Sequence, residues 1–247
     1  MTYRAYFITL LLALTSFQVN ADPAKVAVAS NFTQTIKALA DAFKADTGEE
    51  VQLVFGSTGK LYAQIQHGAP FDAFFAADTE RPQLLEQENR IQPDSRFTYA
   101  RGKLALWSHD PDLVDANGAV LKTNNFRHLA IANPKLAPYG LAAQQTLTAN
   151  GQWQTLQAKI VQGENIGQTF QFINSGNAEL GFVALSQLQQ LDSTDAGSVW
   201  IVPSELYDAI DQQAVQLTDN AVASDFLTFV KSPAAQKLIR SYGYDTP

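Results

Sequence analysis

Apolar and polar residues in the first part of this chain follow two alternating patterns, one of strand type and one of helix type. Short apolar runs predict buried strands, and the segments between them carry apolar residues three or four positions apart, as from Phe32 to Phe43. The predicted strands are 25–29, 51–55 and 71–76, and the predicted helices run from Phe32 to Gly48, around 61–65, and over about 81–88. This β-α-β-α-β-α order predicts a parallel sheet covered by helices.

The same two patterns continue after residue 100, with a loop-rich stretch at 108–125. The predicted strands are 103–107, 129–132, 180–184 and 199–202, and the predicted helical segments are 138–148, 153–160, 166–173, 220–231 and 233–242. We therefore expect an α/β protein with two lobes, each a mostly parallel sheet flanked by helices. The chain is expected to cross between them near 101–105 and 204–210, which makes 22–103 and 205–247 lobe 1 and 104–204 lobe 2.

The first 21 residues have the pattern of an export signal rather than of a folded segment. Arg4 is followed by an apolar stretch from Phe7 to Phe17, and Val19-Asn20-Ala21 is a small-residue cleavage site. The apolar stretch falls short of the roughly 20 residues needed to span a bilayer. We expect a protein exported to the periplasm that begins at Asp22 and does not insert into the membrane.

Charge and composition narrow the possible functions. The net charge is −7, and removal of Arg4 makes it −8, which disfavours nucleic acid as a partner. There is no Cys, so disulfides, thiolate catalysis and zinc–sulfur sites are excluded. The three histidines are scattered without carboxylates at ligand spacing. No metal centre, cofactor site or catalytic constellation is expected, and the protein is predicted not to be an enzyme.

Two loops that precede predicted helices have the composition of an anion site. They are Ser30-Asn31-Phe32-Thr33 and Gly56-Ser57-Thr58-Gly59. At a helix start the first N–H groups lack partners within the helix, and the helix dipole favours an anion there. The two glycines are expected to let the backbone approach a ligand closely. The alternative is simple helix capping by the hydroxyl and amide side chains.

Two further loop-to-helix junctions lie in the predicted second lobe, at 137–140 and 164–167. Two donor loops in each lobe would surround a small tetrahedral oxyanion with uncharged hydrogen-bond donors. Such donors lose less hydration on burial than a cationic group would, and their bonds to an anion are charge-assisted.

Several other functions fit parts of these loops. Gly59-Lys60 lacks the remaining residues of a phosphate-binding P-loop, because Val54 and Leu61 stand at the required Gly and Ser/Thr positions. Ser57-x-x-Lys60 matches one motif of the penicillin-binding serine enzymes, but the two companion motifs are missing. The alternatives left open are a binding protein for another solute such as sulfate, an exported serine hydrolase, and an adhesion or scaffold module.

Over the whole region after the signal, the chain resembles the periplasmic molybdate-binding proteins of ABC importers. The resemblance rests on an ordered set of motifs: 26–30, 55–57, 68–78, 132–134 with 138–140, 180–183, 232–236 and 242–244. It implies a type II periplasmic-binding-protein fold that closes on molybdate or tungstate in the cleft between the lobes. It also implies delivery to the membrane permease of a molybdate transporter, with no cofactor, and a monomer is expected.

The resemblance also implies which residues hold the oxyanion, with no direct bond to the metal atom. Ser30, Asn31 and Ser57 would contribute from the first lobe, and Tyr139 and Ile166 mainly through their backbone N–H groups from the second. Some family members carry a ligand-contacting Tyr where this chain has Ala184. Others lack that Tyr and have Asn at the position of Asn31, so the Asn31 amide is expected to compensate.

Overall fold

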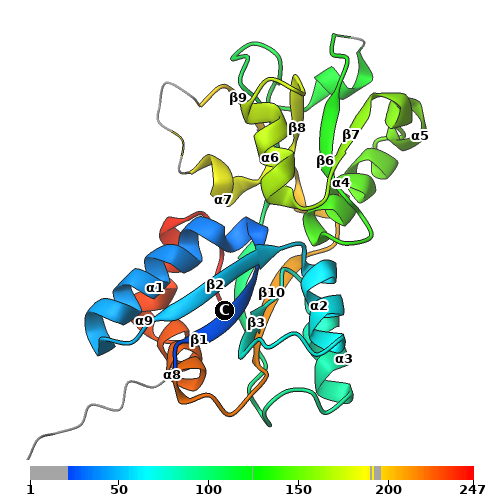
Figure 1. Cartoon of the computed structure of the whole chain (residues 1–247). Coiled ribbons are helices and arrows are strands. Elements are labelled where there is room, and N and C mark those ends of the chain that lie inside the picture. The colour runs from blue at the N-terminus through cyan, green and yellow to red at the C-terminus, as the bar shows by residue number, and fades with distance from the viewer. Residues whose placement is uncertain (1–21, 124, 190, 192–195) are drawn as a thin grey trace, which may run out of the picture.

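The computed structural model describes residues 22–123, 125–189, 191 and 196–247, and it shows two lobes that each contain a five-stranded sheet (Figure 1). The predicted signal at 1–21 lies outside the described residues. No helix in the described part of the chain is both long and apolar enough to cross a membrane.

The sheet of lobe 1 has the strand order β2-β1-β3-β10-β4. Its strands are β1 (Ala24–Ala29), β2 (Val51–Gly56), β3 (Ala73–Phe75), β4 (Phe97–Gly102) and β10 (Ile210–Gln216). β1 pairs in parallel with β2 and β3, whereas β10 is antiparallel to β3 and β4. The sheet is mixed, but it is mostly parallel as expected: β1, β2, β3 and β4 run in one direction, and only β10, which returns from the other lobe, runs in the opposite one.

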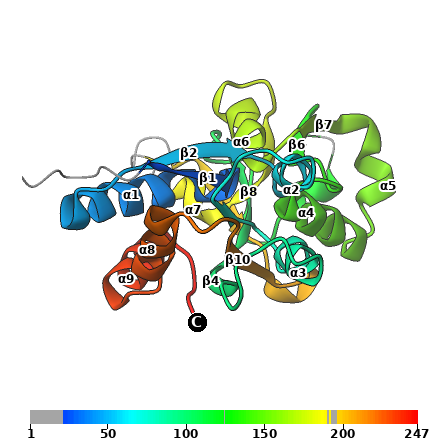
Figure 2. The same cartoon turned by 60° about the horizontal axis from the view of Figure 1, so that its bottom comes forward.

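Helices cover both faces of this sheet, with α1, α8 and α9 on one face and α2 and α3 on the other (Figure 2). Their bounds are α1 (Thr33–Thr47), α2 (Thr58–Gln66), α3 (Glu80–Gln87), α8 (Ala221–Val230) and α9 (Pro233–Ser241), and a short 3-10 helix, η1 (Ser30–Phe32), precedes α1. The apolar positions of α1 face the core, where Phe43 meets Phe226 edge-to-face at 5.2 Å. Gly48 ends α1 in the left-handed conformation, as its position predicts.

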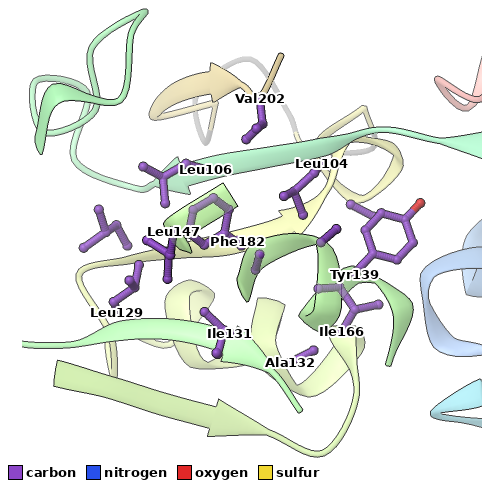
Figure 3. Packing of buried hydrophobic residues seen from close by; sticks show 14 of the residues in the cluster. Leu104, Leu106, Leu129, Ile131, Ala132, Tyr139, Leu147, Ile166, Phe182 and Val202 are labelled. Atoms are coloured by element: carbon purple, nitrogen blue, oxygen red, sulfur yellow. The ribbon is translucent and has the colours of Figure 1, made fainter. Parts of the chain in front are cut away.

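The sheet of lobe 2 has the order β7-β6-β8-β5-β9 and is also mixed. Its strands are β5 (Leu104–Ser108), β6 (Leu129–Ala132), β7 (Ile160–Gly163), β8 (Leu180–Ala184) and β9 (Ser198–Ile201). Its helices are η2 (Ala119–Lys122), α4 (Pro138–Ala149), α5 (Trp153–Leu156), η3 (Gln157–Lys159), α6 (Ile166–Asn174) and α7 (Leu185–Leu188), and η4 (Ser204–Leu206) follows β9. One face packs on α4, with Leu104, Ile131 and Leu147 in its core, and Tyr139 and Ile166 lie at one end of this cluster (Figure 3).

The chain passes between the lobes twice. It enters lobe 2 between β4 and β5 and returns between β9 and β10, and the predicted boundaries at 103/104 and 204/205 lie in these connections. On each side of the crossing the strands are paired: Ala105 is opposite Ile201, and Gly102 is opposite Ile210.

The α/β class and most elements are as predicted, but three strands and one α-helix were not expected. β4, β7, β10 and α7 were absent from the sequence expectation. The sequence of β10, Ile-Asp-Gln-Gln-Ala-Val-Gln, does not alternate clearly, because it carries glutamines at the buried positions 212 and 213.

Candidate functional site

A small cavity lies between the lobes, where η1 and the start of α2 face the starts of α4 and α6. The five predicted residues Ser30, Asn31, Ser57, Tyr139 and Ile166 all line it. Its volume is about 10 Å³, which is about the space of one water-sized sphere. No charged side chain is among its lining residues. The cavity therefore suits a compact ligand held by uncharged donors.

Ser57 is the residue immediately before α2, and its hydroxyl is buried without a protein partner. It makes no side-chain cap bond to the helix, and its Oγ has no hydrogen-bond partner among the described residues. The adjacent hydroxyl of Thr58 has a structural role, because it accepts a hydrogen bond from the N–H of Ala77 at 3.1 Å. Buried polar groups are normally paired, so the Ser57 hydroxyl calls for a partner from outside the chain.

Ser30 connects the two lobes at the edge of the same cavity. Its Oγ accepts a hydrogen bond from the N–H of Gly167 in α6, at 3.2 Å. A hydroxyl that accepts one bond still has its own hydrogen to donate. Ser30 therefore contributes a donor to the cavity, and it does not cap a helix, since η1 begins after Ala29 with no side-chain cap.

The first turn of α4 presents one free donor, the backbone N–H of Tyr139. Pro138 has no N–H group, and the N–H of Gly140 donates to the carbonyl of Ala137 at 2.9 Å. The N–H of Tyr139 has no acceptor in the described part of the chain. Its phenolic oxygen is directed elsewhere, since it accepts a hydrogen bond from Nε2 of Gln212 at 3.2 Å. Tyr139 therefore offers its backbone to the cavity.

The start of α6 has the same arrangement. The side chain of Asn165 accepts the N–H of Gln168 at 3.0 Å, and the N–H of Gly167 is bound to Ser30. Among the described residues, the N–H of Ile166 has no acceptor. Each helix of lobe 2 that reaches the cavity thus leaves one backbone donor there.

The side chain of Asn31 does not take the expected role of a donor in place of a Tyr at position 184. Its Nδ2 donates to Oε1 of Gln212 at 2.8 Å and to the hydroxyl of Tyr244 at 3.1 Å. Both amide hydrogens are thus engaged within the protein, which leaves Asn31 its backbone N–H for a ligand. The methyl group of Ala184, at the end of β8, supplies no donor.

Gly59 approaches the other lobe rather than a ligand, contrary to the sequence expectation. Its N–H donates to the carbonyl of Leu136 at 2.8 Å, and a Cβ at this position would lie 3.1 Å from the Cα of Leu136. Gly167 is similarly close to Ser30, since its Cβ would lie 3.4 Å from the Cβ of that residue. Both glycines permit close contact of the lobes around the cavity.

Lys60 and Arg81, two cations near the site in the sequence, are paired with carboxylates. Lys60 bonds Glu164 across the lobe boundary at 2.5 Å. Arg81 pairs with Asp78 and also donates to the carbonyl of Lys135 in lobe 2, at 3.3 Å. Burial raises the pKa of Asp78, and the charge of Arg81 opposes that rise. Each of these two cations is therefore paired with a carboxylate, and neither directs an unpaired positive charge at the cavity.

The geometry does not favour the serine-hydrolase alternative. Lys60, the base of a Ser-x-x-Lys motif, is engaged by Glu164, while Ser57 has no base bonded to it among the described residues. The described residues also contain no group of three or more His, Cys, Asp or Glu side chains that could hold a metal ion.

Two residues that contact the site from behind, Gln212 and Tyr244, were not predicted as site residues. Both are buried, and both bond Asn31, which is 181 and 213 positions away in the chain. Tyr244 belongs to one of the motifs that carry the family resemblance, and this motif was its one signal in the sequence. Gln212 lies in the unpredicted strand β10 and had none.

The chain matches the family described as bacterial extracellular solute-binding protein over residues 24–245. It is 51% identical to a protein of Azotobacter vinelandii named molybdate-binding protein ModA, over 89% of this chain and 88% of that protein. It is 47% identical to the protein of the same name from Rhodobacter capsulatus, over 89% of this chain and 87% of that protein. The solved structure of the Azotobacter vinelandii periplasmic molybdate-binding protein aligns with a TM-score of 0.88 and 44% identity, covering 91% of this chain and 99% of that one.

Proposed function

Because this chain belongs to the family of bacterial extracellular solute-binding proteins, we infer that it is the molybdate-binding component of an ABC importer. The observation that carries this inference is the buried, unpartnered hydroxyl of Ser57 in an uncharged cavity between the lobes. About half of the residues are identical to those of proteins named for molybdate binding, which supports this ligand.

In the proposed complex the oxyanion accepts hydrogen bonds from both lobes. The hydroxyls of Ser30 and Ser57 and the backbone N–H of Asn31 donate from lobe 1, and the N–H groups of Tyr139 and Ile166 donate from lobe 2. All five are hydrogen bonds to oxygen atoms, so no residue binds the metal atom directly. Bonds of this kind to an anion are about twice as strong as those between neutral groups.

The donor set also explains which anions would be rejected. A protonated oxyanion such as hydrogen phosphate needs an acceptor for its own hydrogen, and the cavity has no carboxylate in its lining. Sulfate would be selected against by size, because a fixed shell of donors fits one ion radius. Tungstate, which has the same charge and shape as molybdate, is proposed as a second ligand.

We further propose that binding draws the two lobes together and that no chemical step follows. Each lobe offers part of the donor set, so the anion prefers the closed arrangement. The closed protein would then dock on the membrane permease of the transporter, acting as a monomer in the periplasm. Cleavage after Ala21 is part of this proposal, and mass spectrometry of the exported protein would test it.

Calorimetry on the purified protein at neutral pH tests the function, with molybdate, tungstate, sulfate and phosphate titrated separately. We expect one-to-one binding of molybdate and tungstate and no heat from the other two anions. Tighter binding of sulfate or phosphate would replace the proposed ligand, and no binding of any of the four would contradict the proposed function.

A further inference from the structure

Behind the anion cavity, at the crossing between the lobes, buried polar side chains form a continuous hydrogen-bonded network. It consists of Asn31, Tyr99, Tyr139, Gln212 and Tyr244, and we call it the crossing network. All five residues are at most 5% exposed. A buried network of this kind fixes the orientation of its members when every polar group is satisfied.

Gln212 is the member that bonds both halves of the anion site. Its Oε1 accepts from Nδ2 of Asn31 at 2.8 Å and from the hydroxyl of Tyr99 at 3.0 Å, both in lobe 1. Its Nε2 donates to the hydroxyl of Tyr139 in lobe 2 at 3.2 Å. One carboxamide therefore contacts η1, just before α1, and the first turn of α4.

The backbone around Gln212 is shaped to admit this contact. A Cβ at Gly102 would lie 2.0 Å from the hydroxyl of Tyr139 and 2.7 Å from Nε2 of Gln212. Gly102 is the last residue of β4, just before the chain enters lobe 2. The pairing of β10 with β4 also shifts register between Gln212 and Gln213. Both features lie where the phenol of one lobe meets the carboxamide of the other.

A second pair crosses the boundary beside Gln212. The hydroxyl of Ser186 in α7 donates to the hydroxyl of Tyr244 at 2.9 Å, and Tyr244 donates to the carbonyl of Asn31 at 2.8 Å. Asn31 is thus bonded on its side chain by Gln212 and on its main chain by Tyr244. Neither bond uses its backbone N–H, which remains for the cavity.

We propose that Gln212 is a positioning residue for anion binding, which holds Asn31 and Tyr139 so that their backbone N–H groups converge on one ligand. This inference rests on the proposed function. Gln212 acts from behind the site and does not contact the anion. Both polar atoms of its buried carboxamide are hydrogen-bonded, and one of these bonds reaches Tyr139 in lobe 2.

The neighbouring Gln213 provides a matched control. It lies in the same strand and is also buried, and its carboxamide bonds Arg96 at 2.9 Å and Thr98 at 3.2 Å, both within lobe 1. Gln213→Met removes comparable hydrogen bonds without affecting the lobe crossing. Gln212→Met removes the bonds that cross it.

The experiment compares molybdate affinity by calorimetry, molybdate dissociation rate, and urea unfolding of the ligand-free protein for the wild type and both variants. We expect Gln212→Met to weaken affinity by about tenfold or more, mainly through faster dissociation. Gln213→Met should bind molybdate within about twofold of the wild-type affinity. Its urea unfolding midpoint should nevertheless fall by about as much as that of Gln212→Met, because comparable hydrogen bonds are lost.

Tyr139→Phe keeps the test decisive if Gln212→Met does not fold, because it removes only the phenolic oxygen that Gln212 bonds. It should weaken molybdate binding, and its effect should not add fully to that of Gln212→Met. Wild-type affinity in either variant, or an equal loss in Gln213→Met, would overturn the positioning role. Failure of the wild type to bind molybdate would instead contradict the proposed function.

Discussion

At the scale of single residues, two adjacent hydroxyls at the start of α2 have different roles. Ser57 Oγ has no partner in the described part of the chain, whereas Thr58 Oγ1 accepts the N–H of Ala77. The Ser57 hydroxyl is therefore available to a ligand, whereas the Thr58 hydroxyl stabilises lobe 1.

We predict that Ser57→Ala weakens molybdate binding by about 1.5–3 kcal/mol, the range for a hydrogen bond to a charged group. The unfolding free energy of the ligand-free protein should not fall, since no protein bond is lost. Calorimetry and urea unfolding measure the two quantities. Unchanged affinity would remove Ser57 from the site.

Thr58→Val is the matched variant and should show the opposite pattern. It leaves the buried N–H of Ala77 without its acceptor, which costs about 1–3 kcal/mol of unfolding free energy. Its binding of molybdate should be affected less than that of Ser57→Ala, because the lost hydroxyl is already engaged within the lobe.

The residues around the cavity were predictable from sequence to different degrees. Ser30 and Ser57 follow apolar runs and precede helical patterns, so local sequence was enough to suggest them. The partner of the Asn31 side chain was not predictable, since Gln212 lies 181 positions away and is reached only through the sheet order. The chain gives no local signal for a contact of that separation.

At the scale of elements, the starts of α2 and α6 contact the opposite lobe through glycines. Neither Gly59 nor Gly167 has a positive φ, so their backbones accept alanine. An added Cβ at Gly59 would meet the other lobe, 3.1 Å from the Cα of Leu136, whereas at Gly167 it would first meet Oδ1 of Asn165 in its own lobe at 3.1 Å and then the Cβ of Ser30 at 3.4 Å. Gly59 is therefore favoured by lobe contact rather than by backbone conformation.

We predict that Gly59→Ala weakens molybdate binding without destabilising the ligand-free protein. The added methyl group presses on Leu136 when the lobes are closed, while alanine favours a helix by up to about 1 kcal/mol over glycine. Calorimetry and thermal unfolding test this, with Gln64→Ala on the exposed face of α2 as the control. A loss of apo stability with unchanged affinity would contradict it.

Among the elements, those with a strong local pattern were predictable and those defined by distant pairing were not. The pattern from Phe32 to Phe43 gave α1, and Pro233 marked the start of α9. β10 was missed because Gln212 and Gln213 are polar residues at buried positions. They are accommodated there by partners on β4, η1 and α4 that the local sequence does not indicate.

At the scale of the whole molecule, the proposed function requires an acidic protein to hold an anion in an uncharged cavity. The net charge of −7 in the full chain, or −8 without Arg4, repels a dianion at long range. Added salt screens that repulsion, since the Debye length falls from about 30 Å at 0.01 M to about 10 Å at 0.1 M.

We predict that the association rate constant for molybdate rises over that range of ionic strength, by a factor of about two to ten. Stopped-flow measurements at several salt concentrations would show it. A rate that falls with added salt would mean that cations of the protein steer the anion to the site.

The tyrosines of the crossing network make stability sensitive to alkaline pH. Burial raises the pKa of Tyr244 from 10 to about 12, against the opposing effect of its hydrogen bonds with Ser186 and Asn31. Burial also raises the pKa values of Tyr99 and Tyr139 well above the usual range. Each folded phenol therefore keeps its proton at a pH where the unfolded one has lost it.

The stabilisation from Tyr244 is thus complete below pH 10 and is lost as the pH rises from 10 to about 12, by about 3 kcal/mol at most. We predict that urea unfolding becomes easier over this range and that Tyr244→Phe makes the dependence shallower. Tyr242→Phe is the matched change outside the network. Equal slopes for Tyr244→Phe and the wild type would contradict the prediction.

The paired strands at the crossing make lobe 2 a continuous insertion into lobe 1. Because Ala105 lies opposite Ile201, the stretch 104–201 begins and ends at neighbouring positions of one sheet. Two recombination junctions are then enough to transplant a complete half of the binding site between homologous genes. Such an exchange would let ligand preference evolve by replacement of lobe 2 as a module, provided that Tyr139 of the new lobe 2 still bonds Gln212 of the original lobe 1.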